Sequence, residues 1–460
     1  MNNASFLAKV RIGVIICCFV LVLGILGCSY VNEKNSSVLD KDNITNNVEN
    51  AENESSDFTY LSAYIKEYGV GNINTYKINQ AESFIKGHFY KELPDKSTLA
   101  KEIVKLFVEH YYDKIDLNDK NAVTDAVLDC FIDAIGDRWA FYRTEEKYQD
   151  YSSDLEGGEE FVGIGVRVDT DSLEISIVLR DSGAYESGIK ARDIIYGVDD
   201  KTIENTPKDE LLNMITGAEG STVKITVKRG DELKEFTVTR KRLIDKTVNY
   251  DIDENNLGHI QITQFLGTTF NEFKEAVDYC TERNVKALVI DVRYNPGGLL
   301  SSVVNIVDYL VPDADGRRIA SYTHSGENIV FYTDDNHGVD VPVVVLCNED
   351  SASGAELFTA AMRDYGKSGA MDTLVIGKAT YGKGLVQTSF LLYDNSALTF
   401  TIGYYNPPCD VNFDGIGVIP DIEVEDDVIG TDKPLGIAIE KALELANKKD
   451  GFTVYLSEAA

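Results

Sequence analysis

Two strand-to-helix turns in the second half of the chain carry residue types that could catalyse acyl transfer. The first ends with the paired glycines Gly297 and Gly298, which expose backbone N–H groups where a helix begins. The second, Asn348–Glu356, places Ser351 and Ser353 at a helix N-terminus, where free N–H groups and the helix dipole would stabilise a developing oxyanion. A plain tight turn and a simple serine N-cap are the alternative interpretations of these two segments.

A lysine lies between two glycines in Gly382-Lys383-Gly384, at the start of an apolar run. Gln387 follows four residues later, so on a strand of period two its side chain would point to the same face as that of Lys383. Burial favours a neutral amine, which can act as a general base, and a nearby amide could orient it. The alternative is an ordinary solvated loop lysine.

These candidate residues lie in a region, Val248–Val428, where strand and helix patterns alternate. Its largely apolar runs at Val285–Val292 and Val341–Cys347 are typical of buried parallel strands. The other elements that we expect there are a strand at His259–Thr263 and helices at Thr268–Arg283, Leu299–Leu310 and Gly354–Tyr365. This alternation predicts an α/β domain, in which reactive groups gather in the turns at the carboxyl ends of the strands.

Short strands dominate the preceding region. We expect strands at Phe161–Val168, Ser172–Leu179, Ile194–Val198, Val223–Lys228 and Glu235–Arg240, with short helices near Ala184–Gly188 and Lys208–Ile215. The segment Phe161-Val162-Gly163-Ile164-Gly165-Val166 resembles the carboxylate-binding loop of PDZ domains, in which glycines direct backbone N–H groups at one anion and a strand edge pairs with a peptide. A flexible strand start is the alternative for this segment alone.

A second segment, Ser187–Ile195, resembles a signature of bacterial PDZ domains. Arg192 stands where that signature has glycine, and Asp200 replaces a glycine that many relatives carry in the following turn. Both changes fall in turns, so the two segments together predict a PDZ domain that binds peptide C-termini.

Helical patterns precede this region. In Asn121–Gly136 the apolar residues Val123, Val127, Phe131 and Ile135 recur every four positions and form one stripe. Gly136 stands where a helix would end. We interpret the stripe as hydrophobic core without chemistry of its own.

The N-terminus has the pattern of an export signal. Basic residues precede an apolar stretch of sixteen residues, Ile12–Gly27, which is shorter than the ~18–20 that a spanning helix needs. The end of this stretch, Ile25-Leu26-Gly27-Cys28, resembles the bacterial lipoprotein box, in which the cysteine is lipidated. We therefore expect an extracytoplasmic protein held at the membrane through Cys28, and an uncleaved N-terminal membrane anchor is the alternative.

The segment that follows is too polar to fold alone. From Ser29 to Asp57, 19 of 29 residues are Asn, Ser, Asp or Glu. This composition predicts a flexible tether over residues 28–57.

Charge and composition exclude several classes of function. The 44 basic and 76 acidic residues give a net charge of −32, which would repel a nucleic acid. The five histidines form no HExxH pair, and the seven cysteines show no CxxC spacing. We therefore expect neither a nucleic-acid partner nor a metal site.

Two further motifs imitate cofactor sites. Gly377–Lys383 nearly matches a phosphate-binding loop, but Gly384 stands where a magnesium-binding Ser or Thr is needed. Asp410–Asp421 imitates a calcium loop, but Pro420 interrupts it and no convincing helices flank it. No cofactor is expected.

The ordered motifs together resemble the carboxyl-terminal processing, or tail-specific, serine proteases. The resembling segments are Asp133–Tyr142, the PDZ loop, His259–Phe265, Asp291–Leu300, Ser351–Glu356, Gly382–Gln387 and Gly415–Val424. The resemblance implies a crotonase-like α/β peptidase core with an inserted PDZ domain and an N-terminal helical domain. It also implies that Ser353 is the nucleophile, Lys383 the general base and Gln387 its orienting partner, with the N–H groups of Gly298 and Gly354 forming the oxyanion hole.

The chain departs from the family pattern in three places. The chain reads S-A-S-G-A-E where the family usually reads S-A-S-A-S-E, and Lys367–Leu374 contains an apparent insertion. Thr216 replaces an arginine that many relatives carry in the PDZ domain, so control of the site by this domain is expected to differ.

These observations predict six segments along the chain. They are a signal peptide at 1–27, a tether at 28–57, a helical domain at 58–150, a PDZ domain at 151–244, a Ser–Lys peptidase core at 245–430 and a C-terminal helical segment at 431–460. The expected function is that of an extracytoplasmic serine endopeptidase whose PDZ domain recognises the C-terminal region of protein substrates. A non-catalytic, PDZ-bearing surface protein that binds peptides is the alternative. Family members often assemble through their terminal segments, so a homodimer formed by Phe58–Lys105 or Pro434–Asn447 is a further expectation.

Overall fold

A computed structural model describes residues 60–170, 172–312, 316–334, 337–425 and 432–457, together with residues 41, 44, 45 and 47. Side chains after residue 448 are not described. The expected signal peptide and the expected lipidation site, Cys28, lie outside the described residues, as does nearly all of the expected tether. Within the described ranges, no helix combines the length and apolar character that crossing a membrane requires.

Helices prevail from residue 61 to residue 156. They are α3 (Leu61–Glu67), α4 (Thr75–His88), α5 (Lys96–His110), α6 (Lys120–Ala134) and α7 (Glu145–Glu156), with the short strand β1 (Phe141–Arg143) before α7. The Asp119 carboxylate caps α6 by accepting from the backbone N–H groups of Asn121 and Ala122. Val123, Val127 and Phe131 are completely buried, which confirms that the predicted stripe is core.

The largest sheet has six strands in the order β10-β11-β12-β15-β16-β19. Its strands are β10 (Val248–Ile252), β11 (Gly258–Ile262), β12 (Leu288–Asp291), β15 (Val343–Cys347), β16 (Thr373–Gly377) and β19 (Ile422–Glu423). All neighbours are parallel except the antiparallel pair β10 and β11. The predicted α/β alternation is therefore confirmed in this region.

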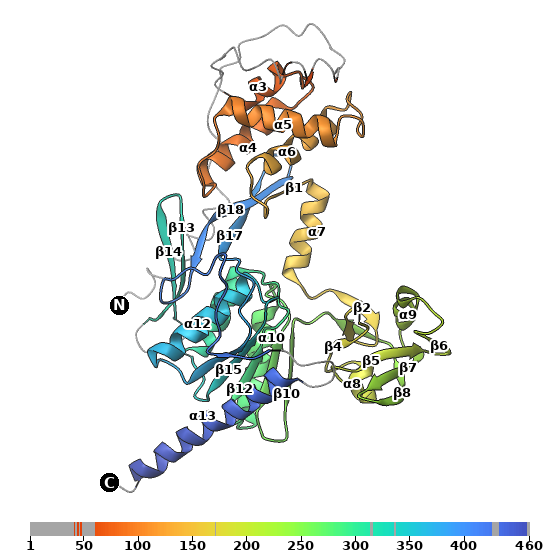
Figure 1. The fold of residues 1–460 in the computed structure, drawn as a ribbon, viewed down its shortest axis with the longest axis vertical. Coiled ribbons are helices and arrows are strands. Elements are labelled where there is room, and N and C mark those ends of the chain that lie inside the picture. The colour runs from red at the N-terminus through yellow and green to blue at the C-terminus, as the bar shows by residue number, and fades with distance from the viewer. Residues whose placement is uncertain are drawn as a thin grey trace, which may run out of the picture. The chain divides into compact units, whose positions relative to one another are not determined.

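Helices cover this sheet (Figure 1). They are α10 (Thr269–Glu282), α12 (Gly354–Ser368) and α13 (Lys433–Ser457), and α11 (Leu300–Leu310) packs against α10 and α12. Ala438 and Ala442 of α13 pack on Val344 and Leu346 of β15 in one hydrophobic core. The intervening strand residues Val343 and Val345 are also fully buried, so β15 is covered on both faces, as expected for a parallel sheet.

A second, antiparallel sheet lies next to α12 and follows the order β1-β18-β13-β14, with β17 also paired to β18. Its other strands are β13 (Arg318–His324), β14 (Glu327–Tyr332), β17 (Leu385–Leu391) and β18 (Ala397–Asn406). Strand β1 pairs with β18 through Phe141 opposite Thr399. The chain just after α6 is thereby fixed beside the β17–β18 hairpin.

The region from residue 160 to residue 244 has a hydrophobic core of its own. Its elements are β2 (Glu160–Gly163), β3 (Val166–Val168), β4 (Ile175–Val178), α8 (Gly183–Ser187), β5 (Ile194–Val198), β6 (Lys201–Thr202), α9 (Lys208–Ile215), β7 (Thr222–Arg229), β8 (Glu232–Thr239) and β9 (Lys241–Ile244). The single strand predicted at Phe161–Val168 is divided, because Gly165 adopts a φ of +78° and turns the chain between β2 and β3. Arg192 has a φ of +72°, which explains why related sequences carry glycine there.

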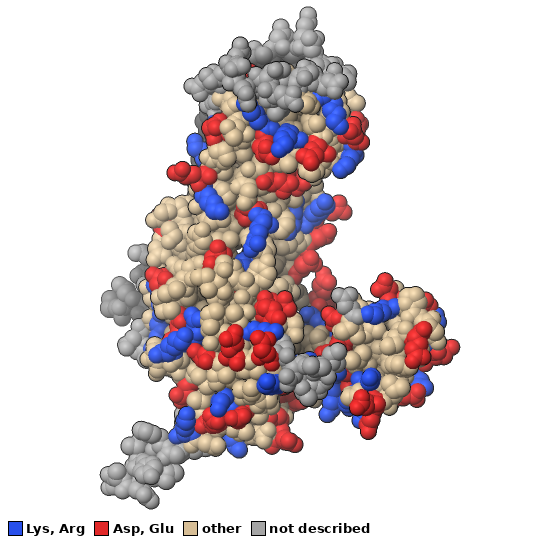
Figure 2. All heavy atoms as spheres, in the orientation of Figure 1, with Lys and Arg blue, Asp and Glu red and all other residues tan. Residues whose placement is uncertain are grey.

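Acidic and basic side chains are interspersed on the visible face of the molecule (Figure 2). On that face, the described residues form no broad basic patch.

Candidate active site

The serine turn joins β15 to α12. Ser353 occupies the N-cap position of α12 and has φ 54° and ψ −114°, a conformation that non-glycine residues rarely adopt. The residue is buried, with 8% of its surface exposed to solvent. Strain of this kind persists where the surrounding structure enforces it, and such positions cluster at functional sites.

The glycine turn lies beside the serine turn, because β12 and β15 are parallel neighbours and both turns follow the carboxyl ends of their strands. A Cβ added to Gly297 would lie 2.7 Å from the backbone nitrogen of Gly354 and 2.8 Å from Cβ of Ser353. Only glycine permits this approach. Among the described residues, the N–H groups of Gly298 and Gly354 have no hydrogen-bond partner.

A buried asparagine joins the two turns. Oδ1 of Asn295 accepts from the N–H of Gly297 at 2.8 Å, and its Nδ2 donates to the Ile262 carbonyl at 2.8 Å. The backbone carbonyl of Asn295 also accepts from the N–H of Ala352 at 2.9 Å. Asn295 therefore fixes the glycine turn against the segment that carries Ser353.

The amine of Lys383 is held by an amide. Nζ donates to Oε1 of Gln387 at 2.9 Å. Burial lowers the pKa of this amine; the nearby Asp137 carboxylate and Glu356 raise the pKa, whereas Arg138 lowers it. The net direction favours the neutral form that a general base requires.

The predicted contact between Lys383 and Gln387 is present, but its structural reason differs from the one expected. Lys383 precedes β17, which begins at Leu385, and the register of β17 shifts between Val386 and Gln387. The two side chains therefore do not meet as equivalent positions on one regular strand face.

Trp139 covers the lysine. The ring centroid of Trp139 lies 4.1 Å from Nζ of Lys383, and the Trp139 carbonyl accepts a hydrogen bond from Nε2 of Gln387. The exposed ring of Tyr381 meets the indole edge-on at a centroid distance of 6.2 Å. An aromatic wall thus covers the amine.

The Glu356 carboxylate connects the serine turn to the lysine loop. Its Oε2 accepts from the N–H groups of Ser353 at 2.8 Å and Lys383 at 2.7 Å. Its Oε1 accepts from Oγ1 of Thr380 and the N–H of Gly382, both at 2.6 Å. Burial raises the pKa of Glu356, and these hydrogen bonds oppose that rise by favouring the carboxylate.

The serine and lysine segments therefore share one carboxylate oxygen, but their reactive atoms are not hydrogen bonded to each other within the described chain. The hydroxyl of Tyr405, which is buried on β18, lies close to the Ser353 side chain.

The predicted peptide-binding loop, Phe161–Val166, spans β2, the turn at Gly165 and the start of β3. A Cβ on Gly165 would lie 2.1 Å from Cβ of Ser182, so the turn requires glycine. The side chain of Ile164 is buried in the local core, whereas Phe161 is exposed. The Ile164 side chain is therefore not accessible to a peptide, and its backbone remains the candidate contact.

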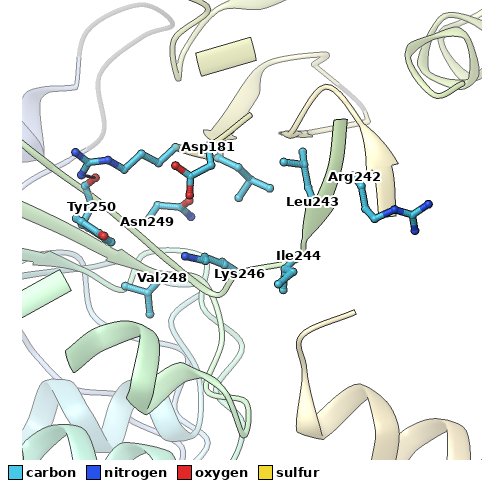
Figure 3. Close-up of a pocket in the computed structure, with 10 residues that line it drawn as sticks. Asp181, Arg242, Leu243, Ile244, Lys246, Val248, Asn249 and Tyr250 are labelled. Atoms are coloured by element: carbon cyan, nitrogen blue, oxygen red, sulfur yellow. Dashed lines mark hydrogen bonds between the residues drawn. The ribbon is translucent and has the colours of Figure 1, made fainter. Parts of the chain in front are cut away.

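A cavity of about 350 Å³ lies away from the serine. Figure 3 shows its lining, which includes Asp181, Leu243, Asn249 and Tyr250. Neither Ser353 nor Lys383 lines it. The cavity therefore does not belong to the candidate catalytic site.

Comparison with protein-family models identifies two regions. The model "Peptidase family S41" matches residues 256–424, which include the serine turn, the glycine turn and the lysine loop. The model "PDZ domain" matches residues 161–239, which include the peptide-binding loop.

Curated relatives extend the match to most of the chain. A probable CtpA-like serine protease of Staphylococcus haemolyticus (strain JCSC1435) is 32% identical over 337 residues, covering 71% of this chain and 66% of that protein. A protein of the same description from Staphylococcus aureus (strain COL) is 30% identical over 338 residues, covering 72% and 66%. The chain thus spans slightly less than two thirds of the length of these relatives.

A solved structure shares the fold. A putative S41 protease from Bacteroides fragilis NCTC 9343 aligns with 82% of this chain and 97% of its own length, with a TM-score of 0.51 and 17% identity. At this identity the likeness concerns the fold alone.

Proposed function

Because the chain belongs to peptidase family S41 and carries a PDZ domain, we propose that it is an extracytoplasmic serine endopeptidase with a Ser353–Lys383 dyad. The observation that carries the proposal is the environment of the Lys383 amine. Trp139 covers this amine and Gln387 holds it. The backbone N–H groups of Lys383 and of the strained Ser353 both donate to the Glu356 carboxylate. A lysine that only solvates the surface would not require an aromatic cover or an amide that holds its amine.

In the proposed reaction, the Ser353 hydroxyl attacks the carbonyl carbon of a peptide bond. The neutral amine accepts the hydroxyl proton as the oxygen–carbon bond forms. The carbonyl oxygen becomes an oxyanion, which accepts hydrogen bonds from the free N–H groups of Gly298 and Gly354. The Lys383 ammonium then donates its proton to the departing amine, and water hydrolyses the acyl-enzyme.

Substrate recognition is assigned to the PDZ domain. The loop Phe161–Val166 would bind the terminal carboxylate through backbone N–H groups, while a strand edge pairs with the peptide. Cys28 would carry the lipid that holds the enzyme on the outer side of the cytoplasmic membrane, with an uncleaved anchor as the alternative. The family's crotonase-like core and dimerisation through terminal segments remain part of this proposal.

The competing proposal is a peptide-binding protein on a protease fold that has lost catalysis. Retention of Ser353, Lys383 and Gln387 together, with the amine in a setting that lowers its pKa, favours the enzyme. A binding protein would need only the PDZ loop.

Cleavage of an intrinsically disordered test protein distinguishes the two. The wild type should cleave it, and Ser353→Ala should not. Ser368→Ala is a matched control, because Ser368 lies at the other end of the same helix and its hydroxyl donates to the Tyr365 carbonyl at 3.0 Å. Equal cleavage by wild type and Ser353→Ala would refute the proposal, and the control should cleave as the wild type does.

A further inference from the structure

Trp139 makes two contacts with the lysine centre, and it reaches that centre from a distant part of the sequence. Its ring lies over Nζ of Lys383 with a centroid distance of 4.1 Å. Its backbone carbonyl accepts from Nε2 of Gln387, whose Oε1 in turn accepts from the same amine. Trp139 therefore contacts both the Lys383 amine and the amide that holds this amine, although Trp139 itself supplies no reacting atom.

The position of Trp139 is fixed by a buried carboxylate. Oδ1 of Asp137 accepts from the N–H of Trp139 at 3.1 Å, and Oδ2 accepts from the N–H of Thr401 at 2.8 Å. Thr401 lies on β18, opposite Gln387 of β17. The indole is thus anchored to the same hairpin that carries Gln387.

We propose that Trp139 is a positioning residue for the proposed general base: its ring shields the Lys383 amine from water, and its carbonyl fixes the amide that orients this amine. The inference rests on the proposed function, because it assigns Trp139 a task only if Lys383 must be neutral. It extends that function by naming the residue that creates the required environment.

The surrounding charges do not supply this environment. Asp137 and Glu356 both favour the ammonium form of Lys383, and only Arg138 opposes it. Gln387 is uncharged, and the exposed Tyr381 ring meets the indole edge-on. Exclusion of water is accordingly the main influence that favours the neutral amine, and the indole is the large side chain placed directly over Nζ.

Removing the ring should move the pH dependence of the reaction. An indole face also attracts an ammonium, so the proposal requires that in Trp139→Ala the loss of water exclusion outweighs the loss of this attraction. The pKa of the amine should then rise toward the ~10.4 of a free lysine and the acid limb of kcat/KM should move to higher pH, whereas a limb that moves to lower pH would overturn the proposal. At any pH below the pKa of both proteins, raising the pKa by one reduces the rate about tenfold, because the neutral fraction of the amine falls tenfold. At pH values above both, the variant should regain most of its rate.

The conservative variant provides the control. Both variants keep the backbone carbonyl, but Trp139→Phe also keeps an aromatic ring, so its acid limb should move less than that of Trp139→Ala. A rate loss in Trp139→Ala that is the same at every pH would overturn the proposal, since a structural defect alone predicts that result. An acid limb of the kcat/KM profile at the same pH in the wild type and both variants would overturn the proposal as well.

A second measurement needs no substrate. Trp139 is the only tryptophan in the chain, so emission excited at wavelengths that the tyrosines do not absorb reports on this position alone. In a Tyr381→Phe background, which removes the neighbouring phenol, emission should change with pH as Lys383 loses its proton. Adding Lys383→Met should abolish that step. A step that survives Lys383→Met overturns the proposal, whereas its loss supports the contact even if every proteolysis assay is negative.

Discussion

Replacing Glu356 with glutamine should disable the site because four donors converge on this carboxylate. Two of them face Oε2 and two face Oε1, and three of the four are backbone N–H groups. The fourth, the Thr380 hydroxyl, already accepts from the N–H of Val418 at 2.7 Å, so its own proton must go to Glu356. A glutamine amide offers one acceptor oxygen, and its NH₂ group would confront two donors.

The expected destabilisation follows from that count. A buried donor without an acceptor costs about 1–3 kcal/mol, so two of them cost about 2–6 kcal/mol before the structure relaxes. Glu272 on α10 provides a matched control. Its Oε2 alone accepts from the N–H groups of Thr247 and Val248 and from the Thr247 hydroxyl. A glutamine there can direct its single oxygen at all three donors, so Glu272→Gln should cost about 0.5–2 kcal/mol, mainly through loss of charge.

Chemical denaturation would measure the free energy of unfolding of both variants, and cleavage of the disordered test protein would measure their activity. Glu356→Gln should be clearly less stable than Glu272→Gln and should lose activity under conditions where it remains folded. Glu272→Gln should retain wild-type activity, because Glu272 contacts neither Ser353 nor Lys383. Equal stability losses in the two variants, or full activity in Glu356→Gln, would refute the claim that the site requires both carboxylate oxygens of Glu356 as acceptors.

Four further perturbations test separate parts of the proposal. Lys383→Arg should be inactive because a guanidinium stays charged. Wild-type rates should rise with pH as the Lys383 amine loses its proton, and burial lowers the pKa at which this happens. A pH–rate profile of both proteins measures the two effects. Gln387→Ala should keep a fraction of the wild-type kcat, because it removes orientation but leaves nucleophile and base; an unchanged kcat would contradict this role. Cys28→Ala should lose metabolic lipid label, and membrane attachment that persists without lipid would instead support an uncleaved anchor. Amidation of a peptide's terminal carboxylate should weaken its binding to the PDZ loop in calorimetry, and equal affinities would contradict that assignment.

The parts of the site that follow from local pattern could be predicted. Apolar runs identified β12 and β15 as buried parallel strands, and parallel neighbours necessarily bring the turns that carry Gly298 and Ser353 to the same edge. The contact between Lys383 and Gln387 was predicted from a regular strand, although the strand begins two residues after Lys383. Close sequence spacing was enough to bring the two side chains together despite the irregular register.

Contacts between distant segments could not be predicted in this way. Trp139 and Gln387 are separated by 248 positions, and Tyr405 reaches Ser353 from a strand of another sheet. Hydrophobic periodicity specifies which face of an element is buried but not which distant element covers it. Asn295 and Glu356 lay inside the motifs that identified the site, yet their roles depend on backbone N–H groups whose directions only the folded chain defines.

Covalent trapping would test the central claim most directly. An activated peptide ester would be mixed with the purified protein, the reaction quenched in acid, and the digested protein analysed by mass spectrometry. The Ser–Lys mechanism predicts that the peptide containing Ser353 gains the mass of the acyl group in the wild type, and that Ser353→Ala shows no such gain. An acyl group on another residue, or turnover of the ester by Ser353→Ala at the wild-type rate, would contradict the proposed mechanism.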